Sequence, residues 1–203
     1  MDILEQYSKA KISAVVRTND ADVSLKIARA IISGGINLVE ITVGKPEMYG
    51  VIKELSDSTD ALIVAGGVIT SRQAQESLRY GAKAIVSPIY QPGLIKLCQA
   101  KNVPVITTAT TPNEAYQAWK AGVQLIKIFP TEQMGGASYI EDLLRHMPFL
   151  NVIATGNVKL NNFEEYLKVG AVAVTVGRDF WLNADENEIA SRAKSASEKV
   201  KLL

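Results

Sequence analysis

The chain has 203 residues, with 22 lysines and arginines, 21 aspartates and glutamates, a net charge of +1 and a hydrophobic fraction of 47 %. This balance is typical of a globular protein; it excludes a disordered chain and argues against a nucleic-acid-binding protein, which carries a basic excess. A single cysteine and a single histidine exclude an internal disulfide, a thiolate metal site and a zinc site built on several histidines. We therefore expect neither a metal nor a cofactor.

The first residues, MDILEQYSKAK, open with an acidic residue and contain no apolar run, so they do not resemble a signal peptide. No stretch reaches the roughly 18 apolar residues that a membrane-spanning helix needs. We expect a soluble, cytoplasmic protein in which segment 2–9 forms a short extra helix covering one end of the fold.

Short runs rich in valine and isoleucine alternate with longer runs of helical periodicity along the chain. Such short apolar strands are typical of a sheet covered on both faces. The expected strands are 12–16, 38–42, 62–65, 84–86, 105–107, 125–128, 152–154 and 172–176. The expected helices are 20–33, 46–57, 71–80, 91–101, 112–121, 137–146, 161–169 and 186–200.

The junctions between these runs carry helix start and stop signals. Thr111 and Glu114 have the spacing of a capping box, and Ser71 is the expected cap of helix 71–80. Glycine closes a helix because it accepts the left-handed conformation, and four glycines stand where helical runs give way to strands: Gly35, Gly81, Gly122 and Gly170.

Eight strand–helix units without a linker predict a single domain over residues 1–203, folded as a (β/α)8 TIM barrel with a short N-terminal helix. The alternative is an open, doubly wound parallel sheet. The chain lacks the G-x-G-x-x-G pattern that often follows the first strand of such a sheet.

Three charged residues stand in or directly after the apolar strands: Arg17, Glu40 and Lys127. Catalytic groups of TIM barrels sit at the carboxyl ends of the strands. Because strand side chains alternate between faces, Glu40 shares a face with Leu38, and Lys127 shares a face with Leu125. Both charges then point into the barrel, where they must pair or be neutralised. The alternatives are strand-end residues in solvent or a purely structural ion pair.

A lysine removed from water is driven towards its neutral amine, which can attack a ketone and form a Schiff base. Arg17 would favour the neutral amine of Lys127 further through like-charge repulsion. Glu40, across the barrel, is placed to move protons, and the planar guanidinium of Arg17 is suited to hold a substrate carboxylate.

The chain resembles the 2-keto-3-deoxy-6-phosphogluconate (KDPG) and 4-hydroxy-2-oxoglutarate aldolase family over nearly its whole length. The resemblance implies a (β/α)8 barrel, a homotrimer, Lys127 as the Schiff-base lysine, Glu40 as general acid/base and Arg17 near the substrate carboxylate. The matching segments are AVVR at 14–17, GGINLVEIT at 34–42, VSP at 86–88, TTPNE at 110–114, IKIFPTE at 126–132 and ATGNV at 154–158.

One departure from the family pattern concerns the pyruvate carboxylate. Gly67 stands where the family has a threonine that helps to bind this group. The loss removes a hydrogen bond to a charged group, worth about 1.5–3 kcal/mol. Lys45, Thr107 and Thr108 are the candidates to replace it.

The other departures concern the substrate phosphate. Thr155 and Gly156 match the start of a phosphate-binding T-G-G turn, but its second glycine is Asn157. The last strand continues into Gly177 and Arg178, where the family typically has Gly-Ser. Arg178 is therefore expected either to bind the phosphate position or to pair with the neighbouring aspartate, residue 179.

The sequence predicts a metal-independent, Schiff-base aldolase that cleaves a small-molecule 2-keto-4-hydroxy acid to pyruvate and an aldehyde. The altered anion positions leave two alternatives: an aldolase for an unphosphorylated or differently shaped keto acid, or a degenerate barrel that serves as a binding or scaffold protein. Neither a nucleic acid nor a membrane is an expected partner.

Overall fold

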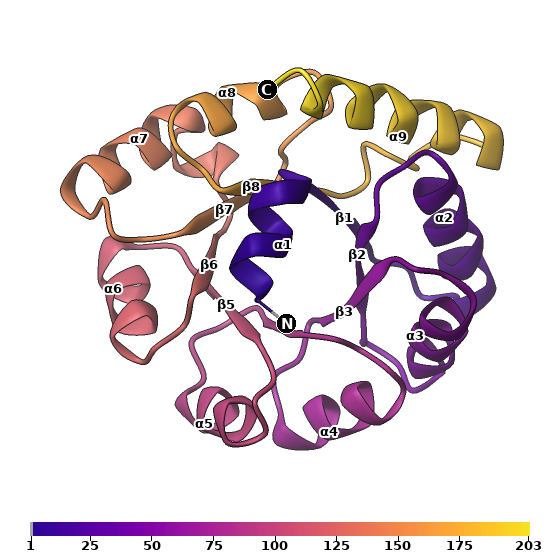
Figure 1. Cartoon of the computed structure of the whole chain (residues 1–203), viewed down its shortest axis with the longest axis horizontal. Helices are drawn as coiled ribbons and strands as arrows, with labels where there is room; N and C mark the ends of the chain where they lie inside the picture. Colours follow the sequence, from indigo (N-terminus) through magenta and orange to yellow (C-terminus); the bar gives the residue numbers. More distant parts are fainter. Residues whose placement is uncertain (1) are drawn as a thin grey trace.

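The computed structural model describes residues 2–203, which form one closed barrel of eight parallel strands in chain order (Figure 1). The ring closes where β1 pairs with β8, with Ile12 opposite Val174, and this pairing rules out the open doubly wound sheet. The expected TIM barrel is therefore confirmed. The strands are β1 Ile12–Val16, β2 Leu38–Thr42, β3 Leu62–Gly66, β4 Ile85–Ser87, β5 Val105–Ala109, β6 Leu125–Ile128, β7 Val152–Thr155 and β8 Ala173–Val176.

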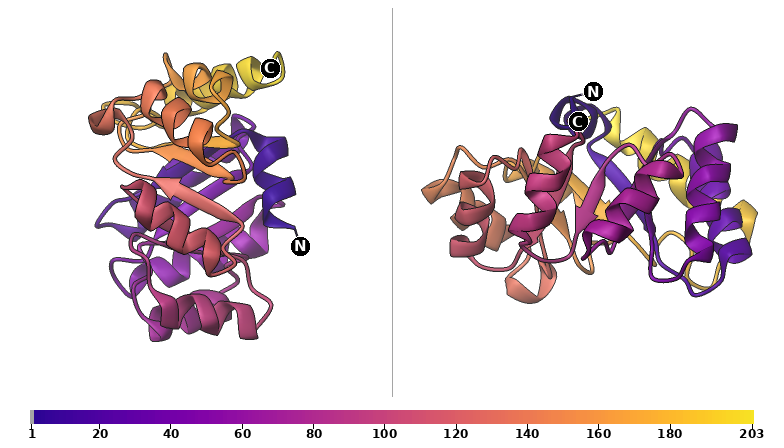
Figure 2. Two further views of the ribbon diagram at one scale, coloured as in Figure 1. Left: turned by 90° about the vertical axis from the view of Figure 1, so that its left-hand side faces the viewer. Right: turned by 90° about the horizontal axis from the view of Figure 1, so that it is seen from below.

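Helices follow the strands and form a ring around the barrel (Figures 1 and 2). All eight predicted strands and helices are present, with ends that differ from the expected ones by at most two residues. Within residues 2–203, no helix combines the length and apolar character that crossing a bilayer requires. The helices are α1 Ile3–Ala10, α2 Ala21–Ser33, α3 Glu47–Ser58, α4 Ser71–Arg79, α5 Pro92–Ala100, α6 Pro112–Lys120, α7 Ala137–His146, α8 Phe163–Lys168 and α9 Glu186–Val200, with a short 3-10 helix η1 at Glu132–Met134.

Two apolar cores share the strands. The outer core lies between the barrel and the helices and takes strand residues such as Val39 and Ile126. The inner core fills the barrel and takes the intervening residues, such as Leu38 and Leu125. Burial on both faces explains why the strands lack the alternation of polar and apolar residues that half-exposed strands show.

The first helix, α1, lies across the amino-terminal end of the barrel (Figure 1). Asp2 caps it by accepting hydrogen bonds from the backbone amides of Leu4 and Glu5, at 2.9 and 3.2 Å. Ile3 and Tyr7, one turn apart, point into the barrel and belong to the inner core. The helix expected at 2–9 thus closes the end of the barrel opposite to the carboxyl ends of the strands.

The capping box at the start of α6 is confirmed. The Glu114 carboxylate accepts hydrogen bonds from the backbone amides of Thr110 and Thr111, both at 2.8 Å, and these bonds lower the pKa of Glu114. The cap expected at Ser71 was wrong by one residue. Thr70 caps α4 in a second capping box, and Ser71 is the first helical residue.

Candidate active site

Glu40 and Lys127 meet inside the barrel from β2 and β6. The Lys127 Nζ donates a hydrogen bond to the Glu40 Oε2. Both residues are buried, since Lys127 is 4 % exposed and Glu40 is 6 % exposed. Removing two charges from water is costly unless they pair closely and find further hydrogen bonds. A buried amine that is hydrogen-bonded to a carboxylate is suited to nucleophilic and acid–base chemistry.

The strand alternation places this pair as the sequence predicts. Leu38 and Leu125, two residues before Glu40 and Lys127 respectively, lie in the inner core. In register, Glu40 lies beside Val15 of β1, and Lys127 lies beside Thr108 of β5. The prediction that both charges point into the barrel is confirmed.

Gly66, the last residue of β3, leaves the space that the Glu40 carboxylate occupies. A Cβ atom at residue 66 would lie 1.9 Å from the Glu40 Oε1, well inside van der Waals contact. The glycine therefore fixes where the carboxylate can sit relative to Lys127.

Replacing Gly66 with alanine should displace the Glu40 carboxylate from Lys127, and we expect kcat of a reaction that depends on this pair to fall about 100-fold, the cost of misplacing a reacting group by about 1 Å. Gly50→Ala in α3 is the matched control, because a Cβ there meets nothing within 4 Å. Equal kcat values for Gly66→Ala and Gly50→Ala would show that the glycine does not position the carboxylate.

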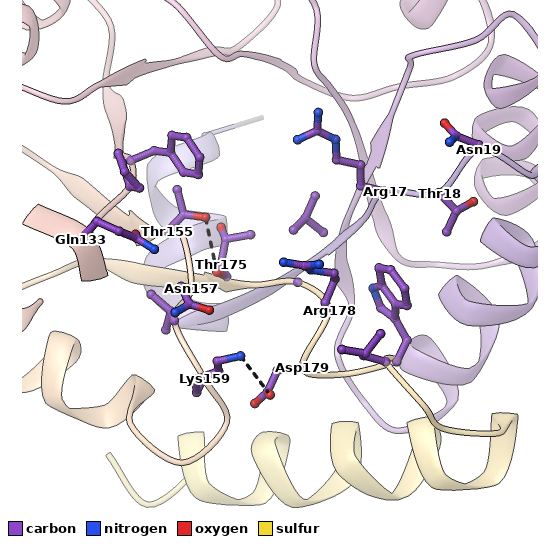
Figure 3. A pocket seen from close by; sticks show the side chains of 18 residues that line it. Arg17, Thr18, Asn19, Gln133, Thr155, Asn157, Lys159, Thr175, Arg178 and Asp179 are labelled. Atoms are coloured by element: carbon purple, nitrogen blue, oxygen red, sulfur yellow. Dashed lines mark hydrogen bonds and ion pairs between the residues drawn. The ribbon is translucent and has the colours of Figure 1, made fainter.

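A cavity of about 880 Å³ opens over the carboxyl ends of β1, β6, β7 and β8 (Figure 3). Val15, the register neighbour of Glu40, and Phe129, two residues beyond Lys127, lie in its wall. Lys127 and Glu40 themselves are not among the residues that line it. The strands that carry the pair therefore reach the cavity through these neighbouring residues.

Six residues expected to bind substrate surround this cavity. Figure 3 shows Arg17 and Arg178 reaching it from the ends of β1 and β8, with Thr155 at the end of β7 and Asn157 on the loop that follows. The expected pairing of Arg178 with Asp179 is not found among residues 2–203. Asp179 instead contacts Lys159, at 3.6 Å, and accepts a hydrogen bond from the backbone amide of residue 160. The six residues are Arg17, Thr155, Gly156, Asn157, Gly177 and Arg178.

The other four expected substrate-binding residues lie outside the cavity wall. Thr107 faces outward, because the preceding Ile106 lies in the inner core, and it donates a hydrogen bond to the Ile89 carbonyl at 2.8 Å. Thr108 faces inward beside Lys127 but donates to the Ser87 carbonyl at 2.8 Å.

Lys45 and Gly67 stand at the ends of β2 and β3. The Lys45 Nζ donates to the carbonyl of Asn19, at 3.1 Å, and so ties the loop after β2 to a residue of the cavity wall. Gly67 adopts a φ of +71°, and a Cβ there would lie 2.9 Å from the Thr42 Cγ2. A threonine at residue 67 would thus be strained in this backbone, which gives a physical reason for the glycine.

The sequence analysis missed several residues of the cavity wall. Gln133 follows the IKIFPTE segment and Lys159 follows ATGNV, so their proximity to matching motifs was the available signal. Trp181 also lines the cavity. Among residues 2–203, the histidine, cysteine and acidic side chains form no group of three or more that could ligate a metal ion.

Comparison with known proteins agrees with this geometry. The family model "KDPG and KHG aldolase" matches residues 3–194. The 2-dehydro-3-deoxy-phosphogluconate aldolase of Treponema pallidum is 31 % identical over 81 % of this chain and 79 % of that protein. The Haemophilus influenzae protein of the same name is 31 % identical over 88 % of this chain and 84 % of its own length.

A solved structure shares the fold closely. The KDPG aldolase of Legionella pneumophila, with pyruvate captured as a covalent carbinolamine intermediate, superposes with a TM-score of 0.88 at 23 % identity, covering 97 % of this chain and 98 % of that one. The family model covers almost the whole barrel, including Glu40 and Lys127. The chain therefore belongs to the KDPG and KHG aldolase family, whose members are lyases.

Proposed function

We propose that the protein is a Schiff-base aldolase that cleaves a 2-keto-4-hydroxy acid, such as KDPG or 4-hydroxy-2-oxoglutarate, to pyruvate and an aldehyde. The observation that carries the proposal is the buried contact between Lys127 and Glu40 inside the barrel, on strands whose neighbouring residues Val15 and Phe129 line the cavity. Membership in the family and the names of the curated relatives support it.

The reaction begins when Lys127 passes a proton to Glu40 along their hydrogen bond and its neutral amine attacks the C2 ketone of the substrate. Glu40 returns the proton to the hydroxyl of the carbinolamine, which leaves as water, and the resulting iminium ion accepts an electron pair. Glu40 then removes the 4-hydroxyl proton, the C3–C4 bond breaks and the aldehyde leaves. Protonation of the enamine at C3 and hydrolysis of the resulting iminium release pyruvate and restore the lysine.

Trapping with pyruvate and borohydride tests this proposal. Reduction of the iminium should add a stable mass to the wild-type protein, and peptide mapping should place it on Lys127. A protein that forms no adduct and cleaves neither substrate would instead support a binding or scaffold role for the barrel.

The cavity can discriminate between substrates by the group that lies far from the ketone. Arg17, Arg178 and Lys159 give its wall a cationic character, and only Lys159 of the three forms an ion pair among the described residues. A guanidinium binds phosphate or carboxylate oxygens through two parallel hydrogen bonds. We assign Arg178 to the anionic group distant from the ketone.

Arg178→Ser should raise KM for KDPG about tenfold while kcat stays within twofold, because the arginine lies away from the reacting carbons and a surface-exposed charged contact contributes about 1.4 kcal/mol. Kinetics with KDPG and with 4-hydroxy-2-oxoglutarate measure whether KM rises more for the substrate with the phosphate or for the one with the carboxylate. Arg79→Ser, on α4 outside the cavity, is the control. An unchanged KM for both substrates would remove Arg178 from the site.

The family resemblance also leads us to propose a homotrimer that acts in the cytoplasm. Sedimentation equilibrium measures the first proposal, since a trimer has three times the 22.0 kDa mass of the chain. Cell fractionation measures the second.

A further inference from the structure

Tyr7 is the one side chain of α1 that carries a polar group into the interior of the barrel. The residue is completely buried, and its ring packs within the inner core together with Leu38 and Leu125. Two small residues of the same core, Ala84 and Ala173, leave room for a ring that enters from the closed end.

The Tyr7 hydroxyl has no hydrogen-bond partner among residues 2–203, although it is inaccessible to solvent. A phenylalanine would fill the same space without burying a polar group, and a buried hydroxyl without a partner opposes folding. Packing alone therefore does not account for a tyrosine at this position.

Glu40 lies on the inward face of β2, two residues beyond Leu38, and its register neighbour on β3, Val64, belongs to the same inner core as Tyr7. Burial, and then the negative charge of Glu40, hold the pKa of Tyr7 well above its usual range, so the phenol remains a neutral donor. The strand sequences of β1, β3, β4, β5, β7 and β8 contain no titratable residue. The titratable groups that face Glu40 within the barrel are therefore Lys127 from β6 and Tyr7 from α1.

The covalent step changes what surrounds Glu40. In the free protein its carboxylate accepts a hydrogen bond from Lys127. Once the lysine nitrogen is bonded to substrate carbon, the carboxylate loses the ammonium donor while it must remain ionised to act as a base. A neighbouring O–H dipole stabilises an ionised carboxylate in a site of low dielectric constant without taking its place as the base.

We propose that Tyr7 is a positioning residue of the catalytic pair, whose buried hydroxyl stabilises the ionised Glu40 carboxylate from the closed end of the barrel while Lys127 is bonded to substrate. The inference rests on the proposed aldolase function and adds to it a contribution from the amino-terminal helix.

The pH dependence of kcat tests this inference with Tyr7→Phe, which removes the hydroxyl and keeps the ring. Losing a dipole that favours the ionised carboxylate makes Glu40 easier to protonate, so the acid limb of the profile should move to higher pH by about half a unit or more. Turnover on the alkaline side of that limb should stay close to that of the wild type.

Ile3→Val is the matched control, because it alters the packing of the same helix in the same core without changing a polar group. Its acid limb should coincide with that of the wild type. The melting temperature of Tyr7→Phe should equal or exceed that of the wild type, since the lost hydroxyl has no partner. Should Tyr7→Phe fail to fold, 3-fluorotyrosine incorporated at position 7 provides a second test: its more acidic hydroxyl is a stronger donor and should move the limb to lower pH.

Superimposed profiles for the wild type and Tyr7→Phe, in a protein that traps pyruvate on Lys127, overturn this inference and leave the aldolase function intact. An equal shift in Ile3→Val also overturns it, because the effect would then come from helix packing. A wild-type protein that traps no pyruvate refutes the proposed function and this inference together.

Discussion

Lys127→Ala is expected to abolish both the borohydride-trapped pyruvate adduct and retro-aldol turnover. Without the amine no covalent intermediate forms, and the rate should fall on the order of 10⁶-fold, the scale on which removal of a covalent nucleophile acts. Intact-protein mass spectrometry measures the adduct, and a coupled assay for pyruvate measures turnover.

The same substitution should also destabilise the fold. It leaves the Glu40 carboxylate buried without its partner, which costs about 3–5 kcal/mol of unfolding free energy. Lys53→Ala is the control, since that lysine is exposed on α3 and pairs with Asp57 in solvent. Retention of the adduct in Lys127→Ala would place the Schiff base on another lysine and contradict the proposed mechanism.

Glu40→Gln should separate formation of the adduct from turnover. The amide retains the shape of the side chain but cannot take the proton of Lys127, so the pyruvate adduct should still form, but more slowly. The amide cannot act as a base, however, and kcat should fall about 10²–10⁴-fold. Quench experiments that follow adduct and aldehyde release separately provide the measurement.

Glu54→Gln, an exposed carboxylate that pairs with Arg29 on the surface, is the control for this substitution. It should leave both steps unchanged. If Glu40→Gln turned over at the wild-type rate, the proton transfers would have to run through another group, and the role proposed for Glu40 would be wrong.

The barrel was predictable because its strands carry two kinds of local signal. Glu40 and Lys127 interrupt otherwise apolar runs, and period-two alternation alone placed both on the inner face. The helix boundaries followed from capping chemistry, as at Thr111 and Glu114. At Ser71 the prediction failed by one residue, because Thr70 beside it is an equally good cap and the sequence does not rank the two.

The features that the sequence did not predict depend on how distant segments meet. Thr107 was expected as a substrate-binding residue, but its hydroxyl donates to the Ile89 carbonyl in the loop after β4, on the face of β5 opposite to the inward-facing Ile106. Neither Trp181 in the cavity wall nor the insertion of Tyr7 into the barrel follows from a local pattern. Both depend on the curvature of the closed sheet, which no single segment encodes.

The two buried charges have a consequence for assembly, because they lie 87 residues apart and on opposite halves of the barrel. A half-barrel ending after β4 holds only the carboxylate, and the half that begins at β5 holds only the ammonium. Neither half alone can pair the charge that it carries. If the ring closed with one strand shifted by one residue, one of the two charges would lie in the outer core and the other would lack a counterion. The pair that performs the chemistry therefore also selects the correct register of the sheet.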